Sequence, residues 1–496
     1  MASTGAEMTA LSGAVQRRAA ARPRYWPGFT VGERKLLLLL VDLVLLNVSL
    51  LAAVWLWNGF VPSAPALLAQ AKWFLTLSVM WVAFAQLFDL YNLARAGSVS
   101  AIASSTGLAA GLTGFTYLAT PWLTPPVLYR SYAFAFLVSC VLLLLGWRVT
   151  YALALYQPTF RRRVLVLGTG PEAQELMADL DEAGSGRAAN PFRGSGYQVL
   201  GLVDTTLAAE PVAASVGRVL GNFSQLVRLA HEQRADEIVV SLEPEGAANE
   251  AVYDVLLDCR ELGLRVVPLA AVCEALTARL RVDYAERDLP ALLSPADSPS
   301  ARLYAVSKRL LDLALALPGL VPLALVTAGI ALANALWAPG PLFYQQQRMG
   351  RGGRPFAVLK FRTMVANAEQ ATGAVWSGDG DPRITPVGRW LRKTRLDELP
   401  QLINVLHGEM SMVGPRPERP HFVGQLMHEL PLYRARHAVK PGITGWAQVH
   451  YGYGNTVEDS RIKLEYDLYY VKHASLYLDI LVLVHTARTV LTMQGQ

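Results

Sequence analysis

Four long apolar stretches alternate with short polar loops over the first part of the chain. They cover residues 35–57, 72–88, 101–123 and 131–147. Each is close to the roughly 20 residues that a helix needs to cross a bilayer. Arginines precede the first stretch and follow the fourth at 161–163, whereas the loop at 58–71 carries neither lysine nor arginine. The positive-inside rule then places both ends in the cytoplasm, which predicts four transmembrane helices.

One charged residue, Asp42, interrupts the first apolar stretch. An acid inside a membrane helix is costly and often functional. Asp42 also lies near the end of the stretch, where contact with lipid headgroups or a neighbouring helix would explain it without a function. We favour this second interpretation.

A different pattern follows the fourth stretch. Residues 161–180 combine a buried-strand pattern, a glycine turn and an amphipathic helix pattern, and further strand-like runs follow at 197–204, 235–243 and 262–269. Strands that alternate with helices predict a parallel α/β sheet of Rossmann type, here over residues 160–292.

The glycine turn in this module has two interpretations. Gly168, Gly170 and Ala173 form a G-x-G-x-x-A pattern, which can bind a dinucleotide at a helix N-terminus. Such a turn also simply connects a strand tightly to a helix. Asp204, which would end the second strand, comes later than the acid of dinucleotide sites, so both interpretations stay open.

A further apolar stretch runs from Leu310 to Trp337 and contains Asp312 as its one charged residue. A straight helix of this length would measure about 40 Å, which exceeds the hydrocarbon core. Pro318 and Pro322 remove helix hydrogen bonds and kink the axis. A fifth span would also place the basic C-terminal third outside, against the charge rule. We therefore expect a re-entrant helix–break–helix over about 305–338, with a kinked full span as the alternative.

Composition supports a membrane protein. Of the 496 residues, 52% are apolar and 17% are charged, which is more apolar than most soluble proteins. The net charge of +6 suits an anionic lipid surface or a phosphorylated substrate better than nucleic acid in so apolar a chain. The three scattered cysteines suggest neither a disulfide framework nor a metal site.

The C-terminal part contains two adjacent acids, Asp397 and Glu398, just ahead of Pro400. Neighbouring residues of a helix do not face one another, so the pair fits a helix N-terminus better, with Leu402 and Val405 packing below. The helix dipole there keeps a carboxylate ionised. One acid can then act as a nucleophile while the other holds a divalent cation. The alternative is that both acids only complement the helix end.

Several cations and one more acid accompany this pair. They are Lys360, Arg362, Arg392, Arg395, Arg416 and Asp467. Lys360 and Arg362 fall on one side of a strand predicted at 358–364, because side chains alternate with a period of two. So many cations near an ionised acid pair favour a phosphate substrate with Mg²⁺.

Four motifs in this part resemble those of the bacterial sugar transferases, the polyprenyl-phosphate hexose-1-phosphate transferases of the monotopic phosphoglycosyl transferase superfamily. In chain order they read KFRTM, LRKTRLDELPQLINVLHGEMSMVGPRPE, VKPGITGWAQV and KLEYDLYYVKHASLYLDILVLVHT. The resemblance covers residues 303–496. The helices and Rossmann-like module ahead of it match the large, WbaP-like branch more loosely. The proline-broken re-entrant helix of this family agrees with our interpretation of 305–338.

The resemblance implies an undecaprenyl-phosphate hexose-1-phosphate transferase in the bacterial inner membrane, with its site on the cytoplasmic face. Such an enzyme transfers sugar-1-phosphate from a nucleoside diphosphate sugar, here a UDP-hexose, to undecaprenyl phosphate and releases UMP. This is the first membrane step of exopolysaccharide, capsule or O-antigen synthesis. By motif, Asp397 would form a covalent aspartyl-phosphosugar intermediate, and Glu398, with Asp397 beside it, would bind Mg²⁺.

The same motifs imply roles for the surrounding residues. Lys360 and Arg392 would neutralise phosphate charge during catalysis, while Arg362, Arg395, Arg416 and Asp467 would line the substrate site. One departure stands out, because the chain continues after Gln448 as HYGYGN, without the phosphate-binding arginine of many small family members. Arg436 and Arg461 are candidates to replace it.

Three rival functions remain. A membrane glycosyltransferase would release UDP and needs no carboxylate nucleophile. An NAD-dependent nucleotide-sugar oxidoreductase would need a Tyr-x-x-x-Lys pair, which residues 161–290 lack. A membrane scaffold would use the acid pair only as a helix cap. The predicted organisation is a tail at 1–33, four spans at 34–155, the α/β module at 160–292 and a mainly α catalytic domain at 303–496. A homodimer through the spans or the α/β module is consistent with this organisation.

Overall fold

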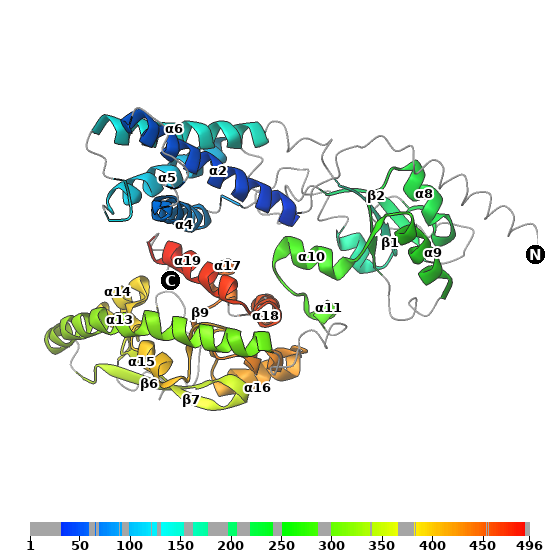
Figure 1. The fold of residues 1–496 in the computed structure, drawn as a ribbon. Helices are drawn as coiled ribbons and strands as arrows, with labels where there is room; N and C mark the ends of the chain where they lie inside the picture. The colour runs from blue at the N-terminus through cyan, green and yellow to red at the C-terminus, as the bar shows by residue number, and fades with distance from the viewer. Residues whose placement is uncertain are drawn as a thin grey trace, which may run out of the picture. The chain divides into compact units, whose positions relative to one another are not determined.

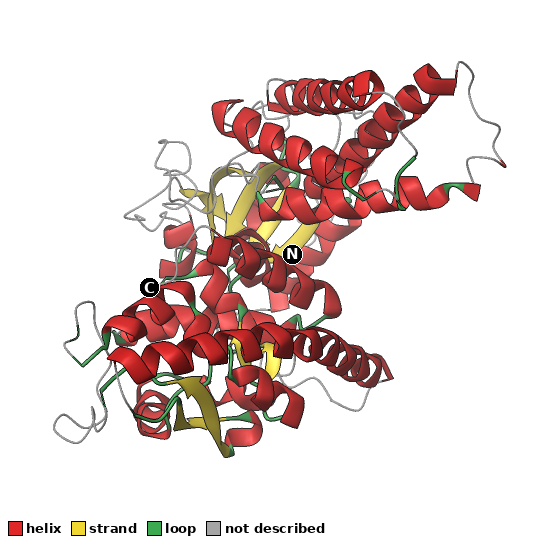
Figure 2. Ribbon diagram, turned by 90° about the vertical axis from the view of Figure 1, so that its left-hand side faces the viewer, coloured by secondary structure: helices red, strands yellow, loops and turns green. Residues whose placement is uncertain are grey.

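A computed structural model describes most of the chain, and helices dominate it (Figure 2). The described residues are 31–58, 65, 69–88, 90–91, 99–120, 122–125, 130–152, 162–176, 197–205, 219–241, 250–285, 299–337, 340–365, 381, 383–452, 454 and 456–491. The predicted tail at 1–33 lies almost wholly outside these residues. The chain divides into two compact units, Met1–Thr277 and Ala278–Gln496.

Four helices form where the first four apolar stretches predict them. They are α2 (Val31–Asn58), α4 (Ala71–Leu87), α5 (Val99–Leu118) and α6 (Arg130–Thr150). α2 packs against α4 and α6, and α5 packs against the same two helices, which closes a four-helix bundle (Figure 1). Large side chains such as Trp81, Tyr117 and Leu144 fill its centre and are fully buried.

Three described helices are long and apolar enough to cross a membrane. They comprise Glu33–Leu56 in α2, Ala133–Thr150 in α6 and Ala301–Asn334 further along the chain. α4 is shorter, with 17 residues, and α5 is rich in glycine, serine and threonine. The chain is therefore a membrane protein by helix length and composition, although only two helices of the bundle reach this standard.

The side chain of Asp42 contacts a neighbouring helix of the bundle. Its carboxylate forms an ion pair with Arg148 of α6 and accepts a hydrogen bond from the Tyr91 hydroxyl across 3.1 Å. Both charged side chains are buried. The interpretation of Asp42 as a contact with a neighbouring helix is confirmed.

The α/β module contains the predicted parallel sheet. Its strands are β1 (Arg162–Leu167), β2 (Tyr197–Asp204), β3 (Val219–Asn222), β4 (Glu237–Val240) and β5 (Arg265–Pro268), in the order β3-β2-β1-β4-β5. Helices α8 (Leu226–Glu232), α9 (Glu250–Glu261) and α10 (Leu269–Thr277) accompany them. The prediction missed β3, because its sequence VLGN is short and only partly buried.

Gly168 shows why the turn after β1 needs glycine. Its φ is +122°, and a Cβ at this position would lie 2.1 Å from the carbonyl oxygen of Ser241 at the end of β4. Only glycine allows so close an approach of two backbones. Tight packing between strands therefore accounts for this glycine, and a bound nucleotide stays an untested interpretation.

The second unit is mainly helical, as predicted. Its helices are α11 (Val282–Ala285), α13 (Pro299–Trp337), α14 (Pro386–Thr394), α15 (Gln401–His407), α16 (Pro420–Glu429), α17 (Trp446–His450), α18 (Val457–Lys472) and α19 (Leu476–Leu491). β6 (Phe343–Met349) and β7 (Pro355–Phe361) form an antiparallel hairpin, and β8 (Ser411–Val413) pairs in parallel with β9 (Gly442–Thr444). Leu280 and Val282 pack against Leu464 and Leu468, so this unit begins earlier than the predicted limit at 292.

The predicted break at Pro318 and Pro322 is wrong, because α13 continues through both prolines. The two prolines are one turn apart and lie on the exposed side of the helix, so the lost hydrogen bonds fall on one face. The other face is held by packing: Ala316 is buried, and Gly319 lies so close to Leu402 that a Cβ would meet its methyl group at 2.8 Å. Neighbouring elements can hold a helix together across prolines in this way.

Polar side chains tie α13 to the rest of the unit. Arg309 donates hydrogen bonds to the carbonyl oxygens of Val405 and Leu406 across 2.7 and 2.8 Å. Asp312 accepts hydrogen bonds from the Ser411 hydroxyl and the Met412 amide, both across 2.8 Å. The apolar helix is thus anchored to the C-terminal end of α15 and to β8, and the opposite end of α15 follows the acid pair.

Candidate active site

The acid pair lies in a short 3-10 turn between two helices. After α14, Arg395 adopts a left-handed φ of 59°, and the turn η5 (Leu396–Glu398) brings both acids to the start of α15. Both acids are buried, and Leu402 and Val405 pack in the core below them. The prediction of an acid pair just ahead of a helix is confirmed.

Asn404 of α15 sets the position of the neighbouring strand. Its side-chain amide donates to the carbonyl oxygen of Ala357 across 2.8 Å, and its amide oxygen accepts from the Leu359 amide across 3.0 Å. These bonds fix β7 beside α15 and bring the next residue, Lys360, to Glu398. Asn404 was not predicted as a site residue, although it lies within the DELPQLINVLHG motif.

Glu398 is held by two cations. Lys360 Nζ and Arg416 donate hydrogen bonds to its Oε1 across 2.9 and 2.8 Å. Its Oε2 accepts no hydrogen bond from the residues that the structure describes. Burial alone would raise the pKa of the Glu398 carboxyl, but the charges of Arg416 and Lys360 outweigh burial and hold that pKa well below its usual value. Glu398 is therefore ionised, as the sequence analysis expected.

Asp397 differs from its neighbour. Within the described part of the chain its carboxylate accepts no hydrogen bond. Burial raises the pKa of Asp397, and the negative charge of Glu398 raises it further, against the opposing charges of Lys360, Arg392 and Arg416. The structure thus pairs a fixed carboxylate with one that is not held by hydrogen bonds, inside a cationic environment.

The other predicted cations fall into two groups. Arg392 donates to the Thr363 hydroxyl across 3.0 Å, and its charge acts on Asp397, while the charge of Arg395 acts on Glu398. Arg362 instead donates to Oδ1 of Asn334 in α13 and to the carbonyl oxygen of Pro341, which follows this helix in the chain. Both bonds lead to partners other than Glu398, so the contacts of Arg362 differ from those of Lys360, and the expectation that the two residues share a side of the strand stays a prediction.

Asp467 reaches the acid pair indirectly. It is buried in α18 and forms an ion pair with Arg436 across 2.7 Å. Burial raises the pKa of Asp467 to about 6, against the charge of Arg436. Arg436 also donates to the backbone carbonyl of Arg416 across 2.9 Å, and Arg416 holds Glu398. Asp467 therefore supports the site through two arginines.

Neither candidate for the missing arginine faces the acid pair. Arg436 is buried against Asp467, and Arg461 pairs with Asp283 across 2.9 Å at the surface. Arg436 instead acts as a link within the site. From the sequence it was predicted only as a substitute for the missing arginine. The signal that could have identified it is its place directly ahead of the VKPGITGWAQV motif.

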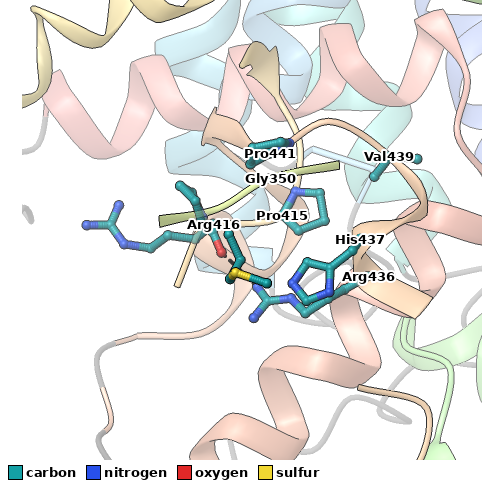
Figure 3. Close-up of a pocket in the computed structure, with 9 residues that line it drawn as sticks. Gly350, Pro415, Arg416, Arg436, His437, Val439 and Pro441 are labelled. Atoms are coloured by element: carbon teal, nitrogen blue, oxygen red, sulfur yellow. Dashed lines mark hydrogen bonds between the residues drawn. The ribbon is translucent and has the colours of Figure 1, made fainter. Parts of the chain in front are cut away.

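A pocket opens beside Arg416 (Figure 3). Its walls are apolar or small residues, namely Met349, Gly350, Pro415, Pro417, Val439 and Pro441. Three polar side chains complete the lining, namely Arg416, Arg436 and His437. The pocket is small, with a cavity volume of about 10 Å³, and it is partly open to solvent.

The residues present can accommodate Mg²⁺ only in part. No group of three or more histidine, cysteine, aspartate or glutamate side chains in the described residues could hold a metal ion. Mg²⁺ commonly binds through one or two carboxylates together with substrate phosphates, so Asp397 and Glu398 are the residues that would hold it in the presence of a diphosphate. Because both hydrogen bonds to Glu398 go to Oε1, Oε2 remains for the ion.

These features define a class of membrane protein in which an apolar helix anchors a module with a buried acid pair surrounded by cations. The chain belongs to the bacterial sugar transferase family, whose model matches residues 303–493.

Three relatives are informative. The UDP-N-acetylgalactosamine-undecaprenyl-phosphate N-acetylgalactosaminephosphotransferase of Aeromonas hydrophila is 43% identical over 265 residues, which cover 53% of this chain and 60% of the relative. The undecaprenyl-phosphate glucose phosphotransferase of Komagataeibacter xylinus is 33% identical over 344 residues, 67% of this chain and 60% of the relative. The UDP-glucose:undecaprenyl-phosphate glucose-1-phosphate transferase of Caulobacter vibrioides is 42% identical over 190 residues, 37% of this chain and 70% of the relative. The matched region thus spans 60% of the length of the first two.

Proposed function

We propose that the protein transfers sugar-1-phosphate from a UDP-hexose to undecaprenyl phosphate and releases UMP. The observation that carries this proposal is the unequal acid pair: Glu398 is ionised and held by Lys360 and Arg416, whereas Asp397 beside it accepts no hydrogen bond from described residues. The names of the three relatives, which specify N-acetylgalactosamine or glucose phosphotransfer to undecaprenyl phosphate, support the same reaction.

In the first step, a carboxylate oxygen of Asp397 attacks the phosphorus that carries the sugar. The bond from this phosphorus to the bridging oxygen breaks, UMP leaves, and an acyl phosphate remains on Asp397. In the second step, a phosphate oxygen of undecaprenyl phosphate attacks the same phosphorus. The acyl phosphate bond breaks, undecaprenyl diphosphate sugar leaves, and the Asp397 carboxylate is restored without a net proton transfer.

The cations stabilise both steps. Lys360 and Arg416 lie within hydrogen-bond distance of Glu398, and the charge of Arg392 reaches Asp397. Fixed positive charge at a buried site stabilises negative charge on transferring phosphoryl oxygens. When bound at Glu398, Mg²⁺ would neutralise diphosphate charge. Asp467 supports one of these cations, Arg416, through Arg436.

The membrane arrangement is part of the proposal. α2, α4, α5 and α6 would span the bacterial inner membrane as four helices, with both ends in the cytoplasm. α13 would enter the membrane from the cytoplasmic face as one unbroken helix, and the acid pair would lie at that face. Its 39 residues would measure about 58 Å as a straight helix, far more than a perpendicular span needs. A homodimer stays a prediction.

The identity of the released nucleotide tests the proposal. Membranes that contain the protein are supplied with undecaprenyl phosphate, Mg²⁺ and either UDP-N-acetylgalactosamine or UDP-glucose. We expect UMP from the wild type and none from Asp397→Asn. Release of UDP would instead establish a glycosyltransferase that leaves the phosphate behind. Full activity of Asp397→Asn would show that the acid pair only caps α15.

A further inference from the structure

A second buried polar cluster lies in the second unit, apart from the acid pair. Its centre is Asp479, in the first turn of α19, whose side chain is fully buried. The hydroxyl of Tyr470 donates to Asp479 Oδ1 across 2.6 Å, and the hydroxyl of Tyr304 donates to Oδ2 across 3.0 Å. The ammonium group of Lys308 lies 3.0 Å from Oδ1. Both carboxylate oxygens are therefore occupied, which is the condition under which a buried charge is tolerated.

The members of this cluster belong to three helices. Tyr304 and Lys308 lie one turn apart on α13, Tyr470 lies on α18 and Asp479 lies on α19. Lys308 also donates to the hydroxyl oxygen of Tyr470 across 3.1 Å, so the tyrosine bridges the cation and the acid. Burial and the charge of Asp479 raise the pKa of Tyr470 well above its ordinary value, so this hydroxyl keeps its proton. The cluster thus ties the apolar helix α13 to α18 and α19.

The cluster continues to β8, the strand that leads into the GPRP motif. The hydroxyl of Tyr470 also reaches the carbonyl oxygen of Val413, the last residue of β8, across 3.3 Å as the longer branch of a shared hydrogen bond. One turn further along α13, Asp312 accepts hydrogen bonds from the Ser411 hydroxyl and the Met412 amide. α13 therefore holds the start of β8 directly and the end of β8 through Tyr470.

The end of β8 leads directly to Arg416. Arg416 follows Val413 by three positions, and the backbone between them is tightly packed. A Cβ on Gly414 would lie 2.3 Å from the carbonyl oxygen of Lys440, so this segment has no space for a sideways shift. The guanidinium of Arg416 in turn donates to Glu398 Oε1 across 2.8 Å. A displacement of Val413 is therefore passed on to the cation that holds Glu398.

The energetics of the cluster favour a role in positioning. A buried ion pair adds little net stability compared with apolar side chains of similar volume. Hydrogen bonds, however, fix both distance and direction, which apolar contacts do not. Geometry of this kind matters near a reacting phosphate, because a misplacement of about 1 Å can lower a catalytic rate about 10²-fold.

We propose that Asp479 is a positioning residue for the phosphoryl transfer, and that it acts through Tyr470 and β8 to hold Arg416 against Glu398. This inference rests on the proposed function for the reaction whose rate is measured. Because two members of the cluster belong to α13, the same contacts couple the apolar helix to the reacting centre.

Turnover by the full-length protein in membranes tests the inference. Asp479→Asn should lower kcat about 10²-fold with little change in KM for the UDP-hexose. Tyr470→Phe removes only the shared hydroxyl and should lower kcat about tenfold, the effect of one hydrogen bond. Asp283→Asn, in a half-exposed ion pair, and Tyr477→Phe, at an exposed tyrosine of α19, are the matched controls and should turn over as the wild type does. Wild-type kcat in both Asp479→Asn and Tyr470→Phe would overturn the inference.

Two further variants separate positioning from a loss of fold. If Asp479 acts through Arg416, Asp479→Asn should lower kcat little further in an Arg416→Ala background, because effects along one path are not additive. Lys308→Met/Asp479→Leu replaces the buried pair by apolar side chains and should recover the melting temperature but not kcat. Losses of kcat that multiply in the Arg416→Ala background, or a kcat that recovers together with the melting temperature, would show that the cluster serves only the fold.

Hydrogen exchange of residues 411–418 provides a measure that needs no turnover. Amides of this segment should exchange faster in Tyr470→Phe than in the wild type or in Tyr477→Phe, because the end of β8 loses a contact. If no donor supports transfer but exchange still depends on Tyr470, the proposed function fails and the contact through β8 stands. If transfer proceeds at the wild-type rate in Asp479→Asn and Tyr470→Phe, the positioning role fails and the proposed function stands.

Discussion

Arg416 donates a hydrogen bond to Oε1 of Glu398 across 2.8 Å, which joins the GPRP motif to the acid pair over 18 positions of sequence. Lys360 donates to the same oxygen from a different element, the hairpin strand β7. Glu398 is thus a fixed, ionised centre around which the second unit places its cations.

Removal of this hydrogen bond should lower the catalytic rate more than it lowers the stability of the fold. Arg416→Ala leaves Glu398 with one cation and removes a positive charge near the reacting phosphate. Loss of one such stabilising group typically lowers kcat by about 10²–10³-fold. UMP release under saturating substrates measures the effect. Arg389→Ala, a change at an exposed arginine of α14, should behave as the wild type. Equal rates for both variants would contradict the role of Arg416.

Substitutions of Lys360 and Arg362 should have different effects, although both residues lie in the KFRTM motif. Lys360→Met should lower kcat by a similar factor, about 10²-fold, because Lys360 faces Glu398. Arg362→Met should retain kcat and lower the melting temperature, because Arg362 bonds to Asn334 and Pro341 at the end of α13. Thermal unfolding and UMP release on the same preparations give both values. An equal loss of kcat in the two variants would support the period-two prediction instead.

The ion pair of Asp467 with Arg436 should be important for stability. Asp467→Asn leaves Arg436 buried without its charge partner, and breaking a buried pair costs about 3–5 kcal/mol. Asp283→Asn breaks the more exposed pair with Arg461 and should cost less than about 1 kcal/mol. The double variant Asp467→Leu/Arg436→Met should recover much of the loss. A similar melting temperature for Asp467→Asn and Asp283→Asn would refute this ranking.

Acidification should destabilise the protein partly through His437. The unfolded chain binds a proton on this histidine near its ordinary pKa of 6.5, whereas the folded protein does so only near a pKa of about 4. The unfolded state therefore binds more protons between these values. The stability that neutral His437 contributes is complete above pH 6.5 and is lost as the pH falls toward 4.

The comparison of variants isolates this effect. The melting temperature of the wild type should fall more between pH 7 and pH 5 than that of His437→Asn, which has no proton to gain. His428→Asn at an exposed position should follow the wild type. Parallel pH curves for the wild type and His437→Asn would mean that His437 is protonated equally in both states.

Local patterns in the sequence predicted the elements well. Alternation of strands and helices gave the parallel sheet, and unbroken apolar runs gave α2, α4, α5 and α6. The acid pair was placed correctly because Pro400 and the apolar residues after it are local signals for the start of α15. These features depend on neighbours in the sequence, so their physical causes can be seen in the sequence.

Features that depend on distant residues were not predicted. α13 passes through Pro318 and Pro322 because Leu402 and other side chains pack on its opposite face. Arg362 bonds to Asn334, which lies 28 positions earlier in the chain. The chain of contacts from Asp467 through Arg436 to Arg416 joins α18, the 3-10 helix Tyr433–Ala438 and the GPRP motif. No local pattern encodes such contacts.

The most direct test of the account is a single turnover without acceptor. Purified full-length protein is mixed with a UDP-hexose and Mg²⁺ in the absence of undecaprenyl phosphate, and the products are examined by nucleotide analysis and peptide mass spectrometry. The account predicts a stoichiometric release of UMP, a hexose phosphate adduct on the peptide that contains Asp397, and loss of this adduct when undecaprenyl phosphate is added. UMP release that requires both substrates, with no adduct at any stage, would contradict the covalent role of Asp397.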